Sequence, residues 1–183
     1  KRISDKLKYT DPFVLCVSHL YPYKNISNMI EAFDLARKTT GTDICLVIAG
    51  KIVSDKYYKT LLSTVNNLGL KESIIFLGLV SKEQLLDLYS SCLFFVFPSP
   101  YESIGITLFE AMTCGAAITC SHTTAIPEAC QDAAIYFNPH NINEMAEKIS
   151  LLILDEKLRK SLTKKSIARV EELLDYEEVT VKT

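Results

Sequence analysis

The sequence predicts an α/β fold built on a doubly wound parallel sheet of about six strands. Short, continuously apolar segments alternate with segments of helical periodicity along the 183 residues. The apolar segments lack the alternation of polar and apolar residues that marks a half-exposed strand. Strands of this kind are typical of parallel sheets covered by helices on both faces, as in Rossmann-like folds. We expect a single domain over residues 1–183, with 1–12 and about 175–183 as linking or crossing segments.

The first half of the chain contains three of the predicted strands, at residues 13–20, 44–49 and 73–77. A turn at residues 21–25 leads into a helix whose apolar side chains fall on one face. Asn25 or Ser27 is expected to cap this helix. A second helix is predicted over residues 54–68, with Gly69 as its C-terminal stop.

The second half continues the same alternation. Ser81 followed by Gln84 predicts a capping box at the start of a helix, because each side chain can bond to the backbone N–H of the other residue. Three further strands are predicted at residues 93–97, 116–120 and 133–137. The helices expected between and after them cover residues 106–114, 141–154 and 156–174. A polar end follows at residues 175–183.

The composition is that of a globular protein, with 48% hydrophobic and 23% charged residues and a net charge of −2. The absence of a basic surplus argues against nucleic acid as a partner. Apolar runs are far shorter than the roughly 20 residues of a membrane-spanning helix. Peripheral contact with a membrane stays open.

The six cysteines lie mostly in apolar segments, without a C-x-x-C pair or a signal peptide. This pattern predicts buried, reduced thiols in a cytoplasmic protein. The three histidines have no metal-like spacing, so no metal site is predicted. Since the chain begins with Lys1, we expect it to be part of a longer polypeptide.

The chemistry concentrates in residues 98–115, PSPYESIGITLFEAMTCG, which follow a buried strand. Gly105 lets a ligand approach the backbone where the next helix starts. The N–H groups of Ile106 and Thr107 are then free to meet an anion such as phosphate, and the helix dipole favours negative charge there. The alternative is that Gly105 merely permits the turn into the helix.

Two carboxylates and one cation accompany this helix start. Glu102 lies in the loop, and Glu110, one turn into the helix, could accept paired hydrogen bonds from a vicinal diol such as ribose. Lys24, after the first strand, could bind the same phosphate. Each of the three could instead be an ordinary solvated side chain.

Ligands of open parallel sheets bind at the carboxyl edge of the strands. That rule places Ser18, His19, Gly78 and Val80 beside the loop that carries Glu102. The G-x-G-x-x-G fingerprint of dinucleotide-binding folds and the G-x-S-x-G elbow of hydrolases are both absent.

The chain resembles the C-terminal domain of retaining GT-B glycosyltransferases of family 4, also called group 1. The resemblance runs through nearly the whole chain, and its specific part is the E-x7-E element from Glu102 to Glu110. The matching segments are FVLCVSHLYPYKN, LVIAG, IIFLGLV, PSPYESIGITLFEAMTCG, ITCS, IPE and AAIYFNP.

The resemblance implies a role for each candidate residue. Glu102 would lie beside the transferred sugar, Glu110 would hold the ribose, and Lys24 would be the cation for the diphosphate. The remaining donor-binding positions would be Ser18, His19, Gly78, Val80, Gly105, Ile106 and Thr107, with residues 76–80 flanking the base. No metal and no cofactor would be needed besides the nucleotide-sugar itself.

Two positions depart from the family pattern. The family usually has Gly-Arg where this chain has Ser18 and His19, and a histidine is mostly neutral at pH 7. A phosphate-facing charge would therefore be weaker or pH-dependent. Ile104 replaces the usual aromatic residue before Gly105, which would alter packing near the sugar.

The function implied is transfer of a hexose from a nucleotide-sugar to a glycan or lipid-linked acceptor in surface polysaccharide synthesis. The acceptor-binding N-terminal domain would be a separate part of the same polypeptide. The setting would be cytoplasmic, and contact with the inner face of the membrane through that other part stays open. Two alternatives remain: a nucleotide-sugar 2-epimerase of the same fold, and a non-catalytic nucleotide-binding module. The E-x7-E element and the IPE segment favour transfer.

Overall fold

The computed structural model describes residues 12–102 and 105–181 of the chain. Its centre is a six-stranded, fully parallel sheet with the strand order β3-β2-β1-β4-β5-β6. This is the doubly wound Rossmann order, in which the direction of winding reverses between β1 and β4. The strands are β1 (Phe13–Val17), β2 (Cys45–Ala49), β3 (Ile74–Gly78), β4 (Phe94–Phe97), β5 (Ile118–Ser121) and β6 (Ala134–Phe137).

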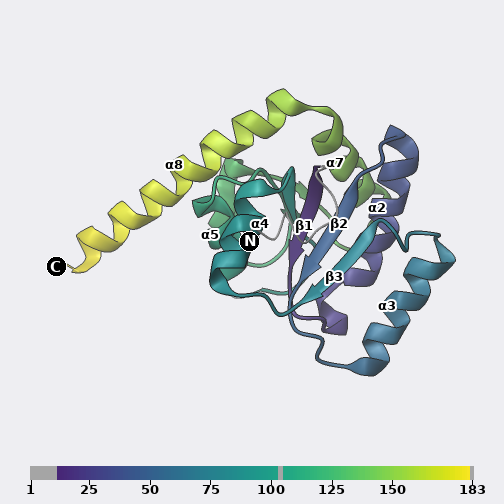
Figure 1. Ribbon diagram of the computed structural model, residues 1–183. Coiled ribbons are helices and arrows are strands. Elements are labelled where there is room, and N and C mark those ends of the chain that lie inside the picture. The colour runs from purple at the N-terminus through teal and green to yellow at the C-terminus, as the bar shows by residue number, and fades with distance from the viewer. Residues whose placement is uncertain (1–11, 103–104, 182–183) are drawn as a thin grey trace.

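Helices cover both faces of the sheet, as the continuously apolar strands require. Figure 1 shows α2, α3 and α7 on one side of the sheet and α4 and α5 on the other. Along β1, Val14 and Cys16 pack into the first layer, whereas Leu15 and Val17 pack into the second. The helices are α2 (Ile26–Thr40), α3 (Asp55–Asn67), α4 (Lys82–Ser91), α5 (Ile106–Thr113), α6 (Ile126–Cys130), α7 (Ile142–Leu154) and α8 (Glu156–Val181).

The sequence identified the six strands, and the structure moves their bounds by a few residues. The largest change is in β1, which ends at Val17 instead of residue 20. The chain turns at Ser18 and His19, and Leu20 returns to form an isolated parallel bridge with Ile52. The short helix α6 was not predicted, because its residues lie within the loop between two buried strands.

Helix capping agrees with the sequence in one place and differs in another. The capping box of Ser81 and Gln84 is present at the start of α4. Asn25 precedes α2 as expected, but its side chain does not cap the helix, and its backbone is left-handed with φ 62°. Ser27 lies inside α2, so neither predicted cap operates.

The last helix is longer than predicted. α8 continues to Val181, whereas the sequence analysis ended it at residue 174. Residues 156–181 contain no glycine or proline that would stop a helix, so polarity alone was a poor stop signal. The buried Ser166 hydroxyl donates to the Ala116 carbonyl oxygen at 3.1 Å and anchors α8 beside β5.

Four of the six cysteines are buried, and the other two are partly exposed. The prediction that the cysteines are buried is confirmed at these four positions. No helix within residues 12–102 and 105–181 has the length and hydropathy needed to cross a membrane.

Candidate functional site

A pocket of about 410 Å³ opens at the carboxyl edge of the sheet, where β1 and β4 diverge. We call it the β1–β4 pocket. It brings together most of the predicted site residues: Ser18, His19, Lys24, Val80, Glu102, Gly105, Ile106 and Thr107. Leu79, from the 76–80 segment expected to flank the base, also lines it. The remaining lining residues were not predicted as site residues: Val17, Tyr21, Tyr23, Ala49, Gly50, Leu85 and Phe97. Several of these residues directly follow a strand in the sequence, and that position was the one signal that could have predicted them.

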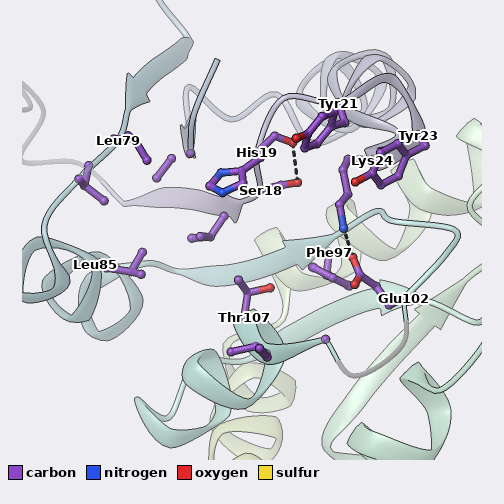
Figure 2. A pocket seen from close by; sticks show the side chains of 16 residues that line it. Ser18, His19, Tyr21, Tyr23, Lys24, Leu79, Leu85, Phe97, Glu102 and Thr107 are labelled. Atoms are coloured by element: carbon purple, nitrogen blue, oxygen red, sulfur yellow. Dashed lines mark hydrogen bonds and ion pairs between the residues drawn. The ribbon is translucent and has the colours of Figure 1, made fainter. Parts of the chain in front are cut away.

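Lys24 and Glu102 meet inside this pocket. The Lys24 Nζ donates to Glu102 Oε1, and the two side chains are 18% and 15% exposed. Figure 2 shows Lys24 reaching across from the loop after β1 to the loop after β4. The sequence predicted that both residues lie at the same edge but not that they pair.

The N-terminus of α5 forms another wall. Gly105 has φ 68°, a left-handed conformation that glycine adopts without strain, and Ile106 and Thr107 follow at the pocket. The first turn of α5 carries no acidic residue. Its positive dipole end and its N–H groups are therefore available to an anion. Ile104, the predicted departure near the sugar, lies outside the described residues.

His19 is held in one tautomer by the backbone. Its Nδ1 accepts a hydrogen bond from the Lys51 N–H at 3.1 Å. Because Nδ1 is the acceptor, the proton lies on Nε2, which remains a donor for a ligand. His19 can therefore donate a hydrogen bond from Nε2 to a ligand in the pocket.

Gly50 makes this arrangement possible. A Cβ atom at Gly50 would lie 2.0 Å from the Ser18 carbonyl oxygen, and its φ is +146°. The loops after β1 and β2 can approach this closely only because residue 50 has no side chain. The sequence offered one signal for it, a glycine directly after a buried strand.

The far wall of the pocket is apolar. Leu79, Val80 and Leu85 line it, which suits the face of a planar base. Gly78 itself is not part of the lining. Its φ of 68° turns the chain after β3, and its carbonyl oxygen accepts from the Gly50 N–H at 2.8 Å.

Glu110 also lies outside the lining of the β1–β4 pocket. Its Oε2 accepts a hydrogen bond from the Tyr89 hydroxyl at 3.1 Å. Burial, and next the charge of Glu110, raise the pKa of Tyr89 well above its usual value. The phenol therefore remains a proton donor, and it fixes one carboxylate oxygen of Glu110.

Asn25 is a positioning residue that the sequence analysis interpreted only as a helix cap. Its Nδ2 donates to the Pro98 carbonyl oxygen at 3.2 Å and to the Pro139 carbonyl oxygen at 2.8 Å. One amide thus ties together the loops after β1, β4 and β6. Since Lys24 is its neighbour in sequence, this bond network also places the cation.

The residues that the structure describes contain no group of three or more histidine, cysteine, aspartate or glutamate side chains able to hold a metal ion. In the β1–β4 pocket, the lysine and the carboxylate of the lining are Lys24 and Glu102, and the α5 N-terminus adds its positive dipole end.

Comparison with known proteins identifies relatives of the chain. The mannosyltransferase WbdA of Escherichia coli is 31% identical over 168 residues, covering 91% of this chain and 20% of that protein. O-antigen chain mannosyltransferase B of Escherichia coli is 28% identical over 172 residues, covering 93% of this chain and 44% of that protein. The chain thus spans less than half the length of these relatives.

Solved structures share the fold. The C-terminal domain of a glycosyl transferase group 1 family protein (LpcC) from Francisella tularensis superposes with a TM-score of 0.79, at 24% identity, over 92% of this chain and 89% of that one. Anabaena Alr3699/HepE in complex with UDP and glucose gives a TM-score of 0.81 at 19% identity, over 97% of this chain and 51% of that one. The model of the family described as "Glycosyl transferases group 1" matches residues 1–169. The chain belongs to the group 1 glycosyltransferases.

Proposed function

We propose that this chain is the donor-binding half of a retaining glycosyltransferase of family 4. The whole protein would transfer a hexose from a nucleotide-sugar to a glycan or lipid-linked acceptor during surface polysaccharide synthesis. The observation that carries the proposal is the convergence of Lys24, Glu102 and the α5 N-terminus in the β1–β4 pocket. The mannosyltransferase relatives favour mannose as the hexose.

The geometry suits a nucleotide diphosphate lying along the sheet edge. The base would pack against Leu79 and Val80, and the diphosphate would lie between Lys24 and the first turn of α5. The free oxygen of Glu110 would reach the ribose hydroxyls. The transferred sugar would then lie beside Glu102, on the side of the pocket nearest β5.

The reaction breaks the bond between the anomeric carbon and the β-phosphate oxygen, and the bonding electrons stay with that oxygen. Lys24 and the α5 dipole would stabilise the charge that develops there. The acceptor hydroxyl oxygen bonds to the anomeric carbon on the same face, and its proton passes to the leaving phosphate. Glu102 would stabilise the oxocarbenium-like sugar. In this proposal no metal or cofactor takes part.

The acceptor-binding half would be a separate domain of the same polypeptide, and the reaction would occur between the two halves. We therefore expect residues 1–183 to bind a nucleotide-sugar without transferring its sugar. The cytoplasmic side of a membrane is the proposed place of action.

The direct test is a thermal-shift panel of UDP-, GDP- and ADP-sugars on this chain. A ligand that binds the folded chain raises its melting temperature by mass action, so the base that fits gives the largest increase. A panel in which no nucleotide-sugar raises the melting temperature would contradict the proposal.

The alternatives are separated in the longer protein. A 2-epimerase would isomerise the nucleotide-sugar without an acceptor, whereas a transferase would leave its sugar unchanged. A non-catalytic module would tolerate Glu102→Gln, whereas the transferase should lose most of its turnover.

A further inference from the structure

The loop that carries Glu102 is bonded to side-chain hydroxyls, two of them from β5 and the loop after it. At the end of β5, the Ser121 Oγ donates to the Ser99 carbonyl oxygen. The Ser99 Oγ donates in turn to the Tyr101 carbonyl oxygen at 3.2 Å. The Glu102 N–H donates to the Thr124 Oγ1 at 3.3 Å. Three backbone groups of the Glu102 loop are thus held by hydroxyls.

The bond between Ser121 and Ser99 lies in the core. Ser121 is fully buried, and Ser99 is 1% exposed. A buried hydroxyl is tolerated when it is hydrogen-bonded, because water no longer solvates it. The Ser121 Oγ donates to Ser99 and also accepts from the Thr123 Oγ1 at 3.3 Å, so it is used in both directions. The two loops therefore share a buried anchor close to Glu102.

The Thr124 hydroxyl is oriented by its own loop. Its Oγ1 accepts from the Glu102 N–H and donates to the Thr123 carbonyl oxygen at 2.8 Å. A hydroxyl has one proton, so its remaining capacity is that of an acceptor once the proton is committed. The bond to Thr123 therefore presents the Thr124 oxygen as an acceptor for Glu102.

The backbone of Thr124 is left-handed, with φ 53°. This region is unfavourable for L-residues other than glycine, and a β-branched residue is a clear outlier there. Glycine would adopt the same backbone freely but would bring no hydroxyl to Glu102. Strained residues cluster at active sites, where the strain can serve to hold a group in place. The group that this conformation places is the Thr124 hydroxyl.

Glu102 is held at two points, and a bound donor would remove one of them. Its carboxylate is paired with Lys24, and its backbone N–H is bonded to Thr124. A diphosphate in the β1–β4 pocket would compete for Lys24 and draw it from the carboxylate. The bond to Thr124 does not involve Lys24, so it would persist. It would then limit the movement of Glu102, and a misplacement of about 1 Å can cost a large factor in rate.

We propose that Thr124 is a positioning residue that keeps Glu102 beside the transferred sugar once the donor has bound. This inference rests on the proposed function, because it takes Glu102 as the carboxylate that faces the sugar. Thr124 is not among the residues that line the β1–β4 pocket, and it acts through the Glu102 backbone. Ser121 and Ser99 hold the preceding part of the loop, so the bond to Thr124 fixes a segment that is already anchored.

The test is isothermal titration calorimetry on residues 1–183 with two ligands. One is whichever of UDP, GDP and ADP stabilises the chain, and the other is its nucleotide-sugar. The ratio of the two affinities isolates the contact with the sugar. Thr124→Ala should weaken nucleotide-sugar binding about threefold or more and change diphosphate binding less than about twofold, because a mobile carboxylate meets the sugar less well. Glu102→Ala keeps the backbone N–H and should lower the ratio at least as much.

Three further variants separate positioning from folding. Thr124→Ser keeps the hydroxyl and should restore the ratio. Thr124→Gly lacks the hydroxyl but suits the left-handed backbone, so it should melt at a higher temperature than Thr124→Ala and still show the lowered ratio. Gln131→Gly is the matched control, since Gln131 is also left-handed, with φ 46°, and is not in the lining of the β1–β4 pocket. It should leave both affinities unchanged.

Three outcomes overturn the inference. Thr124→Ala leaves the ratio unchanged although Glu102→Ala lowers it, or Thr124→Ala weakens both ligands equally, or Thr124→Ser fails to restore the ratio. If Glu102→Ala itself leaves the ratio unchanged, Glu102 does not contact the sugar, and the result counts against the proposed function. The two failures are therefore distinguishable.

Discussion

Lys24 and Glu102 form an ion pair although 78 residues separate them in the sequence. Their side chains are largely withdrawn from water, so solvent and salt screen the pair less than an exposed one. The proposed cation for the diphosphate is thus held by the proposed carboxylate for the sugar. A diphosphate that enters the β1–β4 pocket must compete with Glu102 for Lys24.

Lys24→Met should weaken binding of the stabilising nucleoside diphosphate by about tenfold or more, since a charge-assisted hydrogen bond is lost. Glu102→Gln should strengthen it by about threefold, because the competing carboxylate loses its charge. Isothermal titration calorimetry on residues 1–183 measures both.

Lys38→Met serves as the control for this pair. Lys38 also forms an ion pair, with Asp34, but on α2 outside the β1–β4 pocket. Its substitution should leave nucleotide affinity unchanged. If Glu102→Gln reduced the affinity as much as Lys24→Met, competition between the diphosphate and Glu102 would be ruled out.

Gly50→Ala should lower the free energy of unfolding by about 2 kcal/mol or more, because the new methyl group collides with the Ser18 carbonyl and must displace backbone. It should also reduce nucleotide affinity, since Ser18 and His19 move. Gly69→Ala is the matched comparison: φ is +72° there, but nothing lies within 4 Å of the added Cβ. The Gly69→Ala substitution should lower the free energy of unfolding by about 1 kcal/mol and leave nucleotide affinity unchanged. If urea unfolding showed the same loss of unfolding free energy for both variants, the contact with Ser18 would be unimportant.

Asn25→Asp should destabilise the chain by about 2–3 kcal/mol. The substitution replaces a donor by a carboxylate that faces two carbonyl oxygens, which leaves buried acceptors without partners. Asn25→Gly keeps the left-handed backbone and removes only the amide, so it should cost less. Chemical denaturation of both variants measures which of them loses more unfolding free energy. A milder effect of the aspartate than of the glycine would show that the amide does not hold the loops.

Tyr89→Phe should leave Glu110 without its described hydrogen-bond donor. A freed carboxylate is mobile, so we expect affinity for a ribonucleotide to fall a few-fold. Affinity for the 2′,3′-dideoxy analogue should stay the same, because that ligand lacks the diol. Competition binding of the two nucleotides measures the difference. An equal loss for both ligands would mean that Tyr89 supports the pocket in general and not the ribose contact.

The buried thiol of Cys16 should make the folded chain less stable at alkaline pH. Burial raises the pKa of its thiol to about 12, partly opposed by the positive charge of Lys24. Above the ordinary thiol pKa of about 8.5, the unfolded chain releases this proton and the folded chain keeps it. The free energy of unfolding therefore falls as pH rises, by up to about 1.4 kcal/mol per pH unit from this group. Urea unfolding between pH 8 and pH 10 should show a shallower decline in Cys16→Ala. Parallel pH profiles of the two proteins would exclude the thiol as the cause.

The sheet was predictable because its signal is local and repeated. Each strand is a short apolar run followed within a few residues by a turn or helix start, and the Ser81–Gln84 box is a purely local pattern. The end of α8 was mispredicted for the opposite reason. Its polar residues favoured a tail, while the absence of glycine and proline left no signal that stops a helix.

The candidate site was predictable as a set of residues but not as a network. The rule that ligands bind at the carboxyl edge brought Ser18, Lys24 and Glu102 together. It could not supply the ion pair of Lys24 and Glu102 or the hydroxyl of Tyr89 on Glu110. These contacts depend on side-chain directions across long sequence separations, which no short pattern encodes.

The two hydrogen bonds of Asn25 have a consequence for protein engineering. Three loops that are remote in sequence share one amide donor, so their conformations are set jointly. A chimera that exchanges a single one of these loops with a relative would present Asn25 with a misplaced carbonyl. Specificity swaps within the group should therefore transplant the segments after β1, β4 and β6 as one cassette.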